Sequence, residues 1–179
     1  MAPDGSAALP ELLQQFESAA RAVTATVEYI ERSGEAVRDA VLRKAGGQVP
    51  IVVAASRRLP ASYFAPLIAS PDVLTAPTVE EFRNAPVGVC EAFAGVARTG
   101  SVCVEVSAGM NGFASLIPRL HIAVVDAASI VPQPRDVITS AIGMQSDIVF
   151  ITGPSATADM GPLVRGVHGP HKLHILVLR

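Results

Sequence analysis

The residues best suited to chemistry lie in TGPSATAD, Thr152 to Asp159, directly after the apolar run DIVFI. Ser155 could act as a nucleophile, but a G-x-S-x-G elbow requires glycine where Thr157 stands, so this is the weakest interpretation. Alternatively, the backbone amides around Gly153 and the nearby hydroxyls could cradle a phosphate or carboxylate at a helix start, with Asp159 or Thr157 as the helix cap. The same residue types also form turns without any ligand. The residues leave the cradle and the turn open.

Three histidines recur every third position in GVHGPHKLH, at His168, His171 and His174. A shared helical face would suit a metal, but Gly169-Pro170 disfavours a helix, and the last histidine belongs to a strand pattern. We therefore predict no metal site. His168, flanked by loop residues, is either a proton donor or anion contact, or a histidine that staples the loop by hydrogen bonding to the backbone.

The segment ARTGS, residues 97–101, could add donors from Thr99 and Gly100, although a hairpin turn explains the same residues. Cys90 and Cys103 are too few to hold an iron–sulfur cluster and match no zinc spacing, so both are expected to be core thiols. His121 begins an apolar strand and is expected to be a hydrogen-bonded, half-buried residue.

Strand and helix patterns alternate along the chain, and loops at the carboxyl ends of such strands commonly gather ligands. The spacing predicts a helix over about 8–21 and another from an N-cap at Ser33 to Gly46. Short helices are expected at 61–69, 78–85 and 134–144, with Thr78 as a cap. Predicted strands cover 23–30, 49–56, 85–107 with a turn at 98–101, 120–126, 147–152 and 171–178. The pattern predicts one three-layer α/β/α domain over 1–179, with a mostly parallel sheet and one hairpin.

The composition narrows the function classes. Half of the 179 residues are hydrophobic, and the formal net charge is −2. A nucleic-acid-binding surface is not expected, because it needs clustered positive charge. The sequence contains no apolar run of membrane-spanning length and no secretory leader pattern, so we expect a cytoplasmic protein. The high apolar fraction leaves a homodimer open as an alternative to a monomer.

Three segments resemble one known family. ITGPSATADMGPLVRGVHGPHKLHILVL (151–178) is similar to the C-terminal signature of the LUD domain, the lactate utilization protein C-like family. AGVARTGSVCVEVSAG (94–109) and SLIPRLHIAVVDAASIVP (115–132) are similar to the two segments that precede it, in the same order. Arg98 stands where the family commonly has an acidic residue.

The resemblance implies a fold similar to the NagB/RpiA/CoA-transferase group and an accessory or subunit role in oxidising L-lactate to pyruvate. Iron–sulfur clusters would be carried by partner proteins, because this chain is expected to bind no cofactor of its own. The alternative is a stand-alone enzyme or binding protein for a small anionic metabolite of the phosphorylated, CoA or folate type. The site residues implied are Thr99, Gly100, Thr152, Gly153, Ser155, Thr157 and Gly169, with His168, Asp159 and Ser155 as catalytic candidates.

Overall fold

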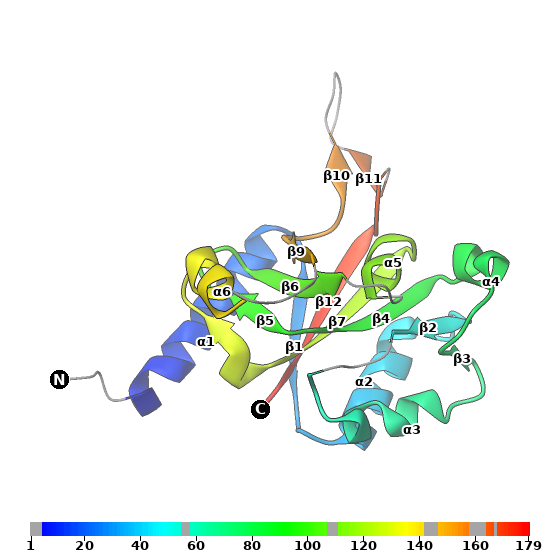
Figure 1. Cartoon of the computed structure of the whole chain (residues 1–179), viewed down its shortest axis with the longest axis horizontal. Coiled ribbons are helices and arrows are strands. Elements are labelled where there is room, and N and C mark those ends of the chain that lie inside the picture. Colours follow the sequence, from blue (N-terminus) through cyan, green and yellow to red (C-terminus); the bar gives the residue numbers. More distant parts are fainter. Residues whose placement is uncertain (1–4, 55–57, 107–110, 142–146, 158–163, 167) are drawn as a thin grey trace.

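The computed structural model describes residues 5–54, 58–106, 111–141, 147–157, 164–166 and 168–179. Asp159 lies outside these ranges. Figure 1 shows the arrangement of the elements. The helices are α1 (Gly5–Ala22), α2 (Gly34–Ala45), η1 (Ala61–Tyr63), α3 (Ala65–Ile68), α4 (Val79–Asn84), α5 (Asn111–Leu116), η2 (Ala127–Ser129) and α6 (Pro134–Ser140). The strands are β1 (Thr26–Ile30), β2 (Ile51–Val53), β3 (Val73–Leu74), β4 (Val87–Ala92), β5 (Ala94–Val96), β6 (Ser101–Val106), β7 (Leu120–Asp126), β8 (Ile130–Val131), β9 (Asp147–Ile151), β10 (Ala156–Thr157), β11 (Val164–Arg165) and β12 (Lys172–Leu178).

A six-stranded parallel sheet forms the centre of the molecule, in the order β1-β12-β7-β4-β2-β3. The pairing of β12 with β7 runs from Lys172 opposite Leu120 to Leu178 opposite Asp126. These strands read as nearly continuous apolar runs, which is typical of parallel strands covered on both faces. The predicted α/β class with a mostly parallel sheet is confirmed.

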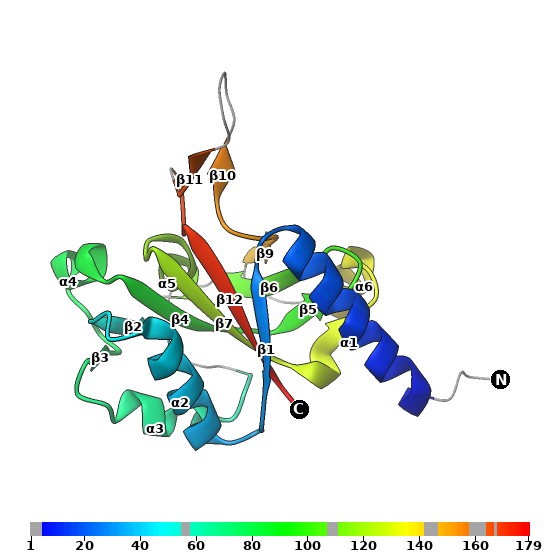
Figure 2. The ribbon, with the colours of Figure 1, turned by 180° about the vertical axis from the view of Figure 1, so that it is seen from behind.

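Side chains alternate between the two faces of this sheet and fill two separate cores. On β7, Ile122 and Val124 belong to the core under α2 and α3, whereas Ala123 and Val125 belong to the core under α1. In Figure 1, α2 and α3 lie below the sheet, and α5, β6 and β9 lie above it. Figure 2 shows α1 from the other side, where it crosses β5 and β6.

The helix ends follow local signals in the sequence. The Ser33 hydroxyl accepts a hydrogen bond from the amide of Ala36 at 3.1 Å, and Gly46 closes α2 in a left-handed conformation. Thr78 and Glu81 form a capping box at the start of α4. The predicted caps are therefore confirmed. Among the described residues, no helix is long and apolar enough to span a membrane.

A second, four-stranded sheet covers part of the face under α1, in the order β8-β5-β6-β9. The predicted hairpin turn at 98–101 joins β5 to β6, which pair antiparallel with Val96 opposite Ser101. The chain leaves the parallel sheet at Phe93, which lies between β4 and β5. The amide of Phe93 donates a hydrogen bond to the carbonyl of Cys103 at 2.9 Å. The sequence did not predict this second sheet, because β4 and β5 form one continuous strand-like pattern.

A helix start capped by Thr157 is not found, and Asp159, the other expected cap, lies outside the described residues. Thr157 lies instead in β10, which pairs antiparallel with β11, Ala156 opposite Arg165. This ribbon projects from the body of the molecule at the top of Figure 1. A cradle built on a helix start therefore has no support at Thr157, because extended strands do not aim successive amides at one point.

Candidate functional site

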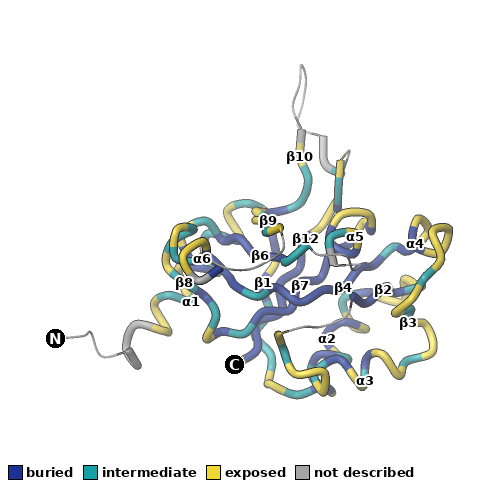
Figure 3. Tube along the Cα trace, in the orientation of Figure 1, coloured by how far each residue is buried: buried dark blue, intermediate teal, exposed yellow. Residues whose placement is uncertain are grey.

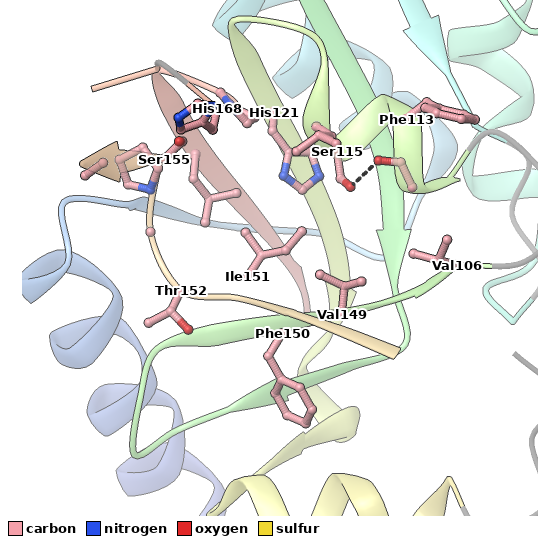
Figure 4. A pocket seen from close by; sticks show the side chains of 18 residues that line it. Val106, Phe113, Ser115, His121, Val149, Phe150, Ile151, Thr152, Ser155 and His168 are labelled. Carbon is pink, nitrogen blue, oxygen red and sulfur yellow. Dashed lines mark hydrogen bonds between the residues drawn. The ribbon is translucent and has the colours of Figure 1, made fainter. Parts of the chain in front are cut away.

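A cavity of about 800 Å³ lies where the second sheet approaches the amino ends of β7 and β12. Its walls come from α5, β9 and the two segments 152–156 and 168–170. Figure 4 shows these side chains around the cavity. A volume of this size matches sites that hold a cofactor-sized or drug-sized ligand.

The position of this cavity corrects one expectation. The segment 152–156 does follow the carboxyl end of β9, but β9 belongs to the second sheet. In the parallel sheet, the lining residues His121 and Leu173 are each the second residue of their strand. The cavity is therefore at the amino edge of that sheet, the opposite edge from the usual ligand position in open α/β sheets.

Most of the residues predicted for the site line this one cavity. The structure places Thr152, Gly153, Ser155, His168 and Gly169 in its lining. Thr99 and Gly100 are not among the lining residues, and Thr157 continues into the β10–β11 ribbon. Val106 and Phe113 also line the cavity, although they are far in the sequence from Ser155 and His168. What the cavity binds stays a prediction.

The backbone of Ser155 holds the two loops together. Its amide donates to the carbonyl of Pro170 at 2.9 Å, and its carbonyl accepts from the amide of Gly166 at 2.9 Å. A Cβ on Gly169 would lie 3.0 Å from the Ser155 Cβ, so glycine permits the close approach of the loops. Because the Ser155 amide is already occupied, the side-chain hydroxyl is the donor that this residue offers to a ligand.

Gly153 gives the first loop its direction. It has φ +77°, a conformation that favours glycine, and a Cβ there would meet the carbonyl oxygen of Val23. The turn thus brings the segment after β9 against the connection between α1 and β1. The glycine has a clear structural role, independent of any ligand.

Thr99 does not line the cavity but is connected to its wall by a chain of hydroxyl hydrogen bonds. Its Oγ1 lies 2.7 Å from Ser101 Oγ, which lies 2.7 Å from Thr152 Oγ1 on the cavity wall. Gly100 has φ +64° and packs on the backbone of Ala19 and Ala20 in α1, where a Cβ has no room. Thr99 therefore supports the wall from behind, whereas Gly100 allows the β5–β6 turn to contact α1.

His121 is a polar lining residue that was not predicted for the site. It is fully buried rather than half-buried, and its Nε2 lies 3.0 Å from Cys90 Sγ. Burial lowers the pKa of His121 from 6.5 to about 3, so the ring is neutral at pH 7. Its Nδ1 is buried without a hydrogen-bond partner. The only signal in the sequence was a histidine inside the otherwise apolar run LHIAVVD.

The described lining is largely apolar and carries no Lys, Arg, Asp or Glu side chain. Its polar side chains are those of Ser115, His121, Thr152, Ser155 and His168. Ser115 Oγ donates to the carbonyl of Gly112 at 2.8 Å, so this hydroxyl already has a partner. The cavity can therefore offer hydrogen bonds from neutral groups, together with His168, which is exposed.

The other histidines lie elsewhere. His174 Nδ1 is 2.7 Å from Thr26 Oγ1 on β1, and burial lowers the pKa of this histidine to about 4. His171 is exposed and lines a separate pocket with Lys44 and Arg119. Within the described ranges, no group of three His, Cys, Asp or Glu side chains is placed to hold a metal ion. Cys90 and Cys103 are buried free thiols, as predicted.

Comparisons with known proteins agree with the resemblance seen in the sequence. The family model described as the LUD domain matches residues 74–178. Lactate utilization protein C of Bacillus subtilis is 37% identical over 108 residues, which cover 55% of this chain and 45% of that protein. Lactate utilization protein B of Bacillus pumilus is 29% identical over 107 residues, 55% of this chain and 21% of that protein. The chain thus spans about half the length or less of these relatives.

One solved structure shows the same fold. A DUF162 family protein from Deinococcus radiodurans superposes with a TM-score of 0.73 at 22% identity, over 96% of this chain and 98% of that one. Every residue that lines the cavity, from Val106 to Leu173, falls within the part matched by the family model. On this match, which covers more than half of its length, the chain belongs to the LUD domain family.

Proposed function

We propose that this chain takes part in lactate utilization, as the LUD-domain subunit or accessory of a system that oxidises L-lactate to pyruvate. The supporting observation is that the large cavity is lined entirely by residues of the region matched by the LUD domain. A lactate utilization protein C is similar to 55% of this chain. In this proposal the cavity binds a small organic ligand, with the Ser155 hydroxyl and the His168 imidazole as its polar contacts.

Electron transfer would be carried by iron–sulfur proteins that associate with this chain. A lactate utilization protein B contains a segment similar to this chain that makes up only 21% of its length, so it has ample sequence for other modules. The two cysteines here are both buried in the core, away from the surface where a cluster would meet a partner. The partner would therefore supply the redox centre, and the cavity would supply ligand binding.

Growth on L-lactate tests the proposal. A strain with this gene deleted is expected to grow poorly on L-lactate and to be rescued by the wild-type chain. Ser155→Ala and His168→Ala are expected to rescue at least about tenfold less well, because each removes a polar contact to the ligand. Ser62→Ala and His171→Ala are matched controls, since both side chains are exposed outside the cavity. Equal rescue by all four variants would overturn a role for this cavity in lactate utilization.

Association with partners has its own test. The tagged wild-type chain, purified gently from cells grown on L-lactate, is expected to bring down proteins with the visible absorption of iron–sulfur clusters. Absence of such proteins, with normal growth rescue, would leave the chain as a stand-alone protein.

A second candidate is a stand-alone protein that binds a phosphorylated, CoA-type or folate-type metabolite. The cavity volume of about 800 Å³ favours it, because it exceeds what lactate alone would fill. Binding of such a metabolite that is lost in Ser155→Ala would support this function.

A further inference from the structure

The cavity wall contains a buried histidine, one nitrogen of which has no hydrogen-bond partner. His121 is fully buried, lines the cavity, and has an Nδ1 atom without a hydrogen-bond partner. Figure 4 shows its ring among the lining side chains, facing the same space as Val149 and Ile151. Buried polar groups are nearly always hydrogen-bonded, and leaving one unpaired is unfavourable. This unpaired atom belongs to a ring in the cavity wall.

His174, the other buried histidine, shows the contrast. Its Nδ1 lies 2.7 Å from Thr26 Oγ1, and its Nε2, although not in a hydrogen bond, lies 3.3 Å from the Glu28 carboxylate. Both of its nitrogens thus face polar atoms of the protein. The unpaired nitrogen of His121 has no hydrogen-bond partner in the protein, and its ring is part of the cavity wall instead.

The Cys90 thiol determines which hydrogen-bonding role His121 can offer. Sγ and Nε2 are 3.0 Å apart, and burial raises the pKa of the thiol, so Cys90 keeps its hydrogen. A thiol sulfur is a weak acceptor, whereas a neutral imidazole nitrogen is a good one. The stronger pairing has S–H donating to Nε2. The ring hydrogen then sits on Nδ1, which becomes a donor without a partner in the protein.

The surroundings of this donor select an uncharged acceptor. The nearby walls are apolar, from Phe113 and Leu116 on α5 to Val149 and Ile151 on β9. The described lining carries no Lys or Arg side chain, and the His121 ring is neutral. An anion placed against this wall would lose its hydration without gaining an opposite charge, which is strongly unfavourable. A carbonyl oxygen accepts the same hydrogen bond without that penalty.

We infer that the cavity binds a neutral, largely apolar compound whose carbonyl oxygen accepts a hydrogen bond from Nδ1 of His121. The apolar body would pack between α5 and β9, and its more polar end would face Ser155 and His168. A ring ketone, as in a quinone, and the acyl carbonyl of a thioester both present this chemistry. The inference rests on the proposal that this cavity is the functional site.

Three probes of the same size isolate the carbonyl. We would measure binding of 2-acetylnaphthalene, 2-ethylnaphthalene and 2-naphthoate to the full chain by isothermal titration calorimetry. The ketone is expected to bind about fivefold or more tighter than the hydrocarbon, the typical effect of one hydrogen bond. The carboxylate is expected to bind more weakly than the ketone. Equal affinity of ketone and hydrocarbon, or tighter binding of the carboxylate, would overturn the inference.

A pair of variants tests the atom itself. The side-chain amide of His121→Asn reaches the position of Nδ1, whereas that of His121→Gln reaches the position of Nε2. His121→Asn is expected to retain the preference for ketone over hydrocarbon, and His121→Gln is expected to lose it. Unliganded melting temperatures of the two variants show whether both are folded. Both variants disturb the contact with Cys90, so a general loss of packing would lower ketone binding in His121→Asn and His121→Gln alike. Equal loss of the ketone preference in both variants would therefore also contradict the inference.

Competition distinguishes the two sources of the carbonyl. Displacement of 2-acetylnaphthalene by 2,3-dimethyl-1,4-naphthoquinone would indicate a ring ketone, and displacement by a short acyl thioester of N-acetylcysteamine would indicate an acyl group. If 2-naphthyl phosphate binds while the ketone does not, the ligand class is wrong but the cavity remains the proposed site. If no probe binds, the inference fails, and the growth test of Ser155→Ala and His168→Ala then decides the proposed function separately.

Discussion

The parallel sheet and the edge strand β9 contain similar apolar residues but differ in how far these residues are buried. β12 (Lys172–Leu178) and β9 (Asp147–Ile151) are both strongly apolar strands. β12 lies between β1 and β7, and every residue after Lys172 is buried, whereas Val149 and Phe150 on β9 are 41% and 37% exposed. Figure 3 shows the buried central strands in dark blue and the exposed β9 in yellow and teal. Position in the sheet, not composition, decides which apolar strand stabilises the fold.

The exposed apolar residues of β9 are not scattered. Val149, Phe150 and Ile151 line the cavity together with Phe113 and Leu116 of α5, which are also exposed. The parallel sheet is therefore enclosed by its cores, whereas β9 and α5 keep apolar surface open to the cavity. Surface of this kind commonly marks a binding site.

The largest expected effect is a difference in unfolding free energy between matched substitutions in the parallel sheet and in β9. Val124→Ala on β7, fully buried, is expected to lower the free energy of unfolding by about 2 to 3 kcal/mol, through lost burial and the cavity left behind. Val149→Ala on β9 is expected to lower it by less than about 1 kcal/mol. Denaturant unfolding of both variants measures the difference. Similar losses would mean that β9 is as tightly packed as the centre of the sheet.

Acid pH is expected to lower the free energy of unfolding through the two buried histidines of the parallel sheet. His121 and His174 have folded-state pKa values of about 3 and about 4, below the 6.5 of a free histidine. Below pH 6.5 the unfolded chain therefore binds more protons than the folded chain, and stability falls as the pH falls. The two together are expected to remove about 2 kcal/mol of unfolding free energy between pH 6.5 and 5.5. Denaturant unfolding at both pH values measures this, and His121→Asn should reduce the decrease by roughly half.

A smaller effect tests the support behind the cavity wall. Thr152→Val removes the hydroxyl that lies 2.7 Å from Ser101 Oγ, and Ser101 is buried. The expected loss is about 1 kcal/mol of unfolding free energy. Thr139→Val is the matched control, because Thr139 is exposed and bonds only within its own helix, to the carbonyl of Arg135 at 2.9 Å. An equal effect in both would show that the hydroxyl chain from Thr99 to Thr152 adds nothing to stability.

The smallest effect on stability is expected at the edge strand itself. β9 is the last strand of the second sheet in the described part of the chain, and exposed apolar edges favour self-association. Phe150→Lys is expected to change the unfolding free energy by no more than about 0.5 kcal/mol. The same change should lower self-association at high protein concentration, as measured by light scattering. Unchanged scattering, or a large loss of stability, would show that Phe150 is not a free edge residue.

Local features were determined by the sequence alone. Ser33, Gly46, Thr78 and the turn at 98–101 act where the sequence predicts, because caps and turns depend on hydrogen bonds within a few residues. The first helix was predicted over about 8–21 and extends over Gly5–Ala22. Apolar runs likewise identified β2, β4, β7 and β12 of the parallel sheet, since two covered faces require continuous hydrophobic sequence. The two-residue strand β3 was not predicted.

Tertiary structure alone decided three further features: that the chain changes sheets at Phe93, that Thr157 enters a strand ribbon, and that His121 lines a cavity. Each depends on residues distant in sequence, such as the pairing of β6 with β9 and the approach of Gly169 to Ser155. Periodicity reports which residues are apolar, but it contains no information about which strand becomes a neighbour. Whether an apolar strand is sealed or left beside a cavity is therefore determined only when the distant segments pack together.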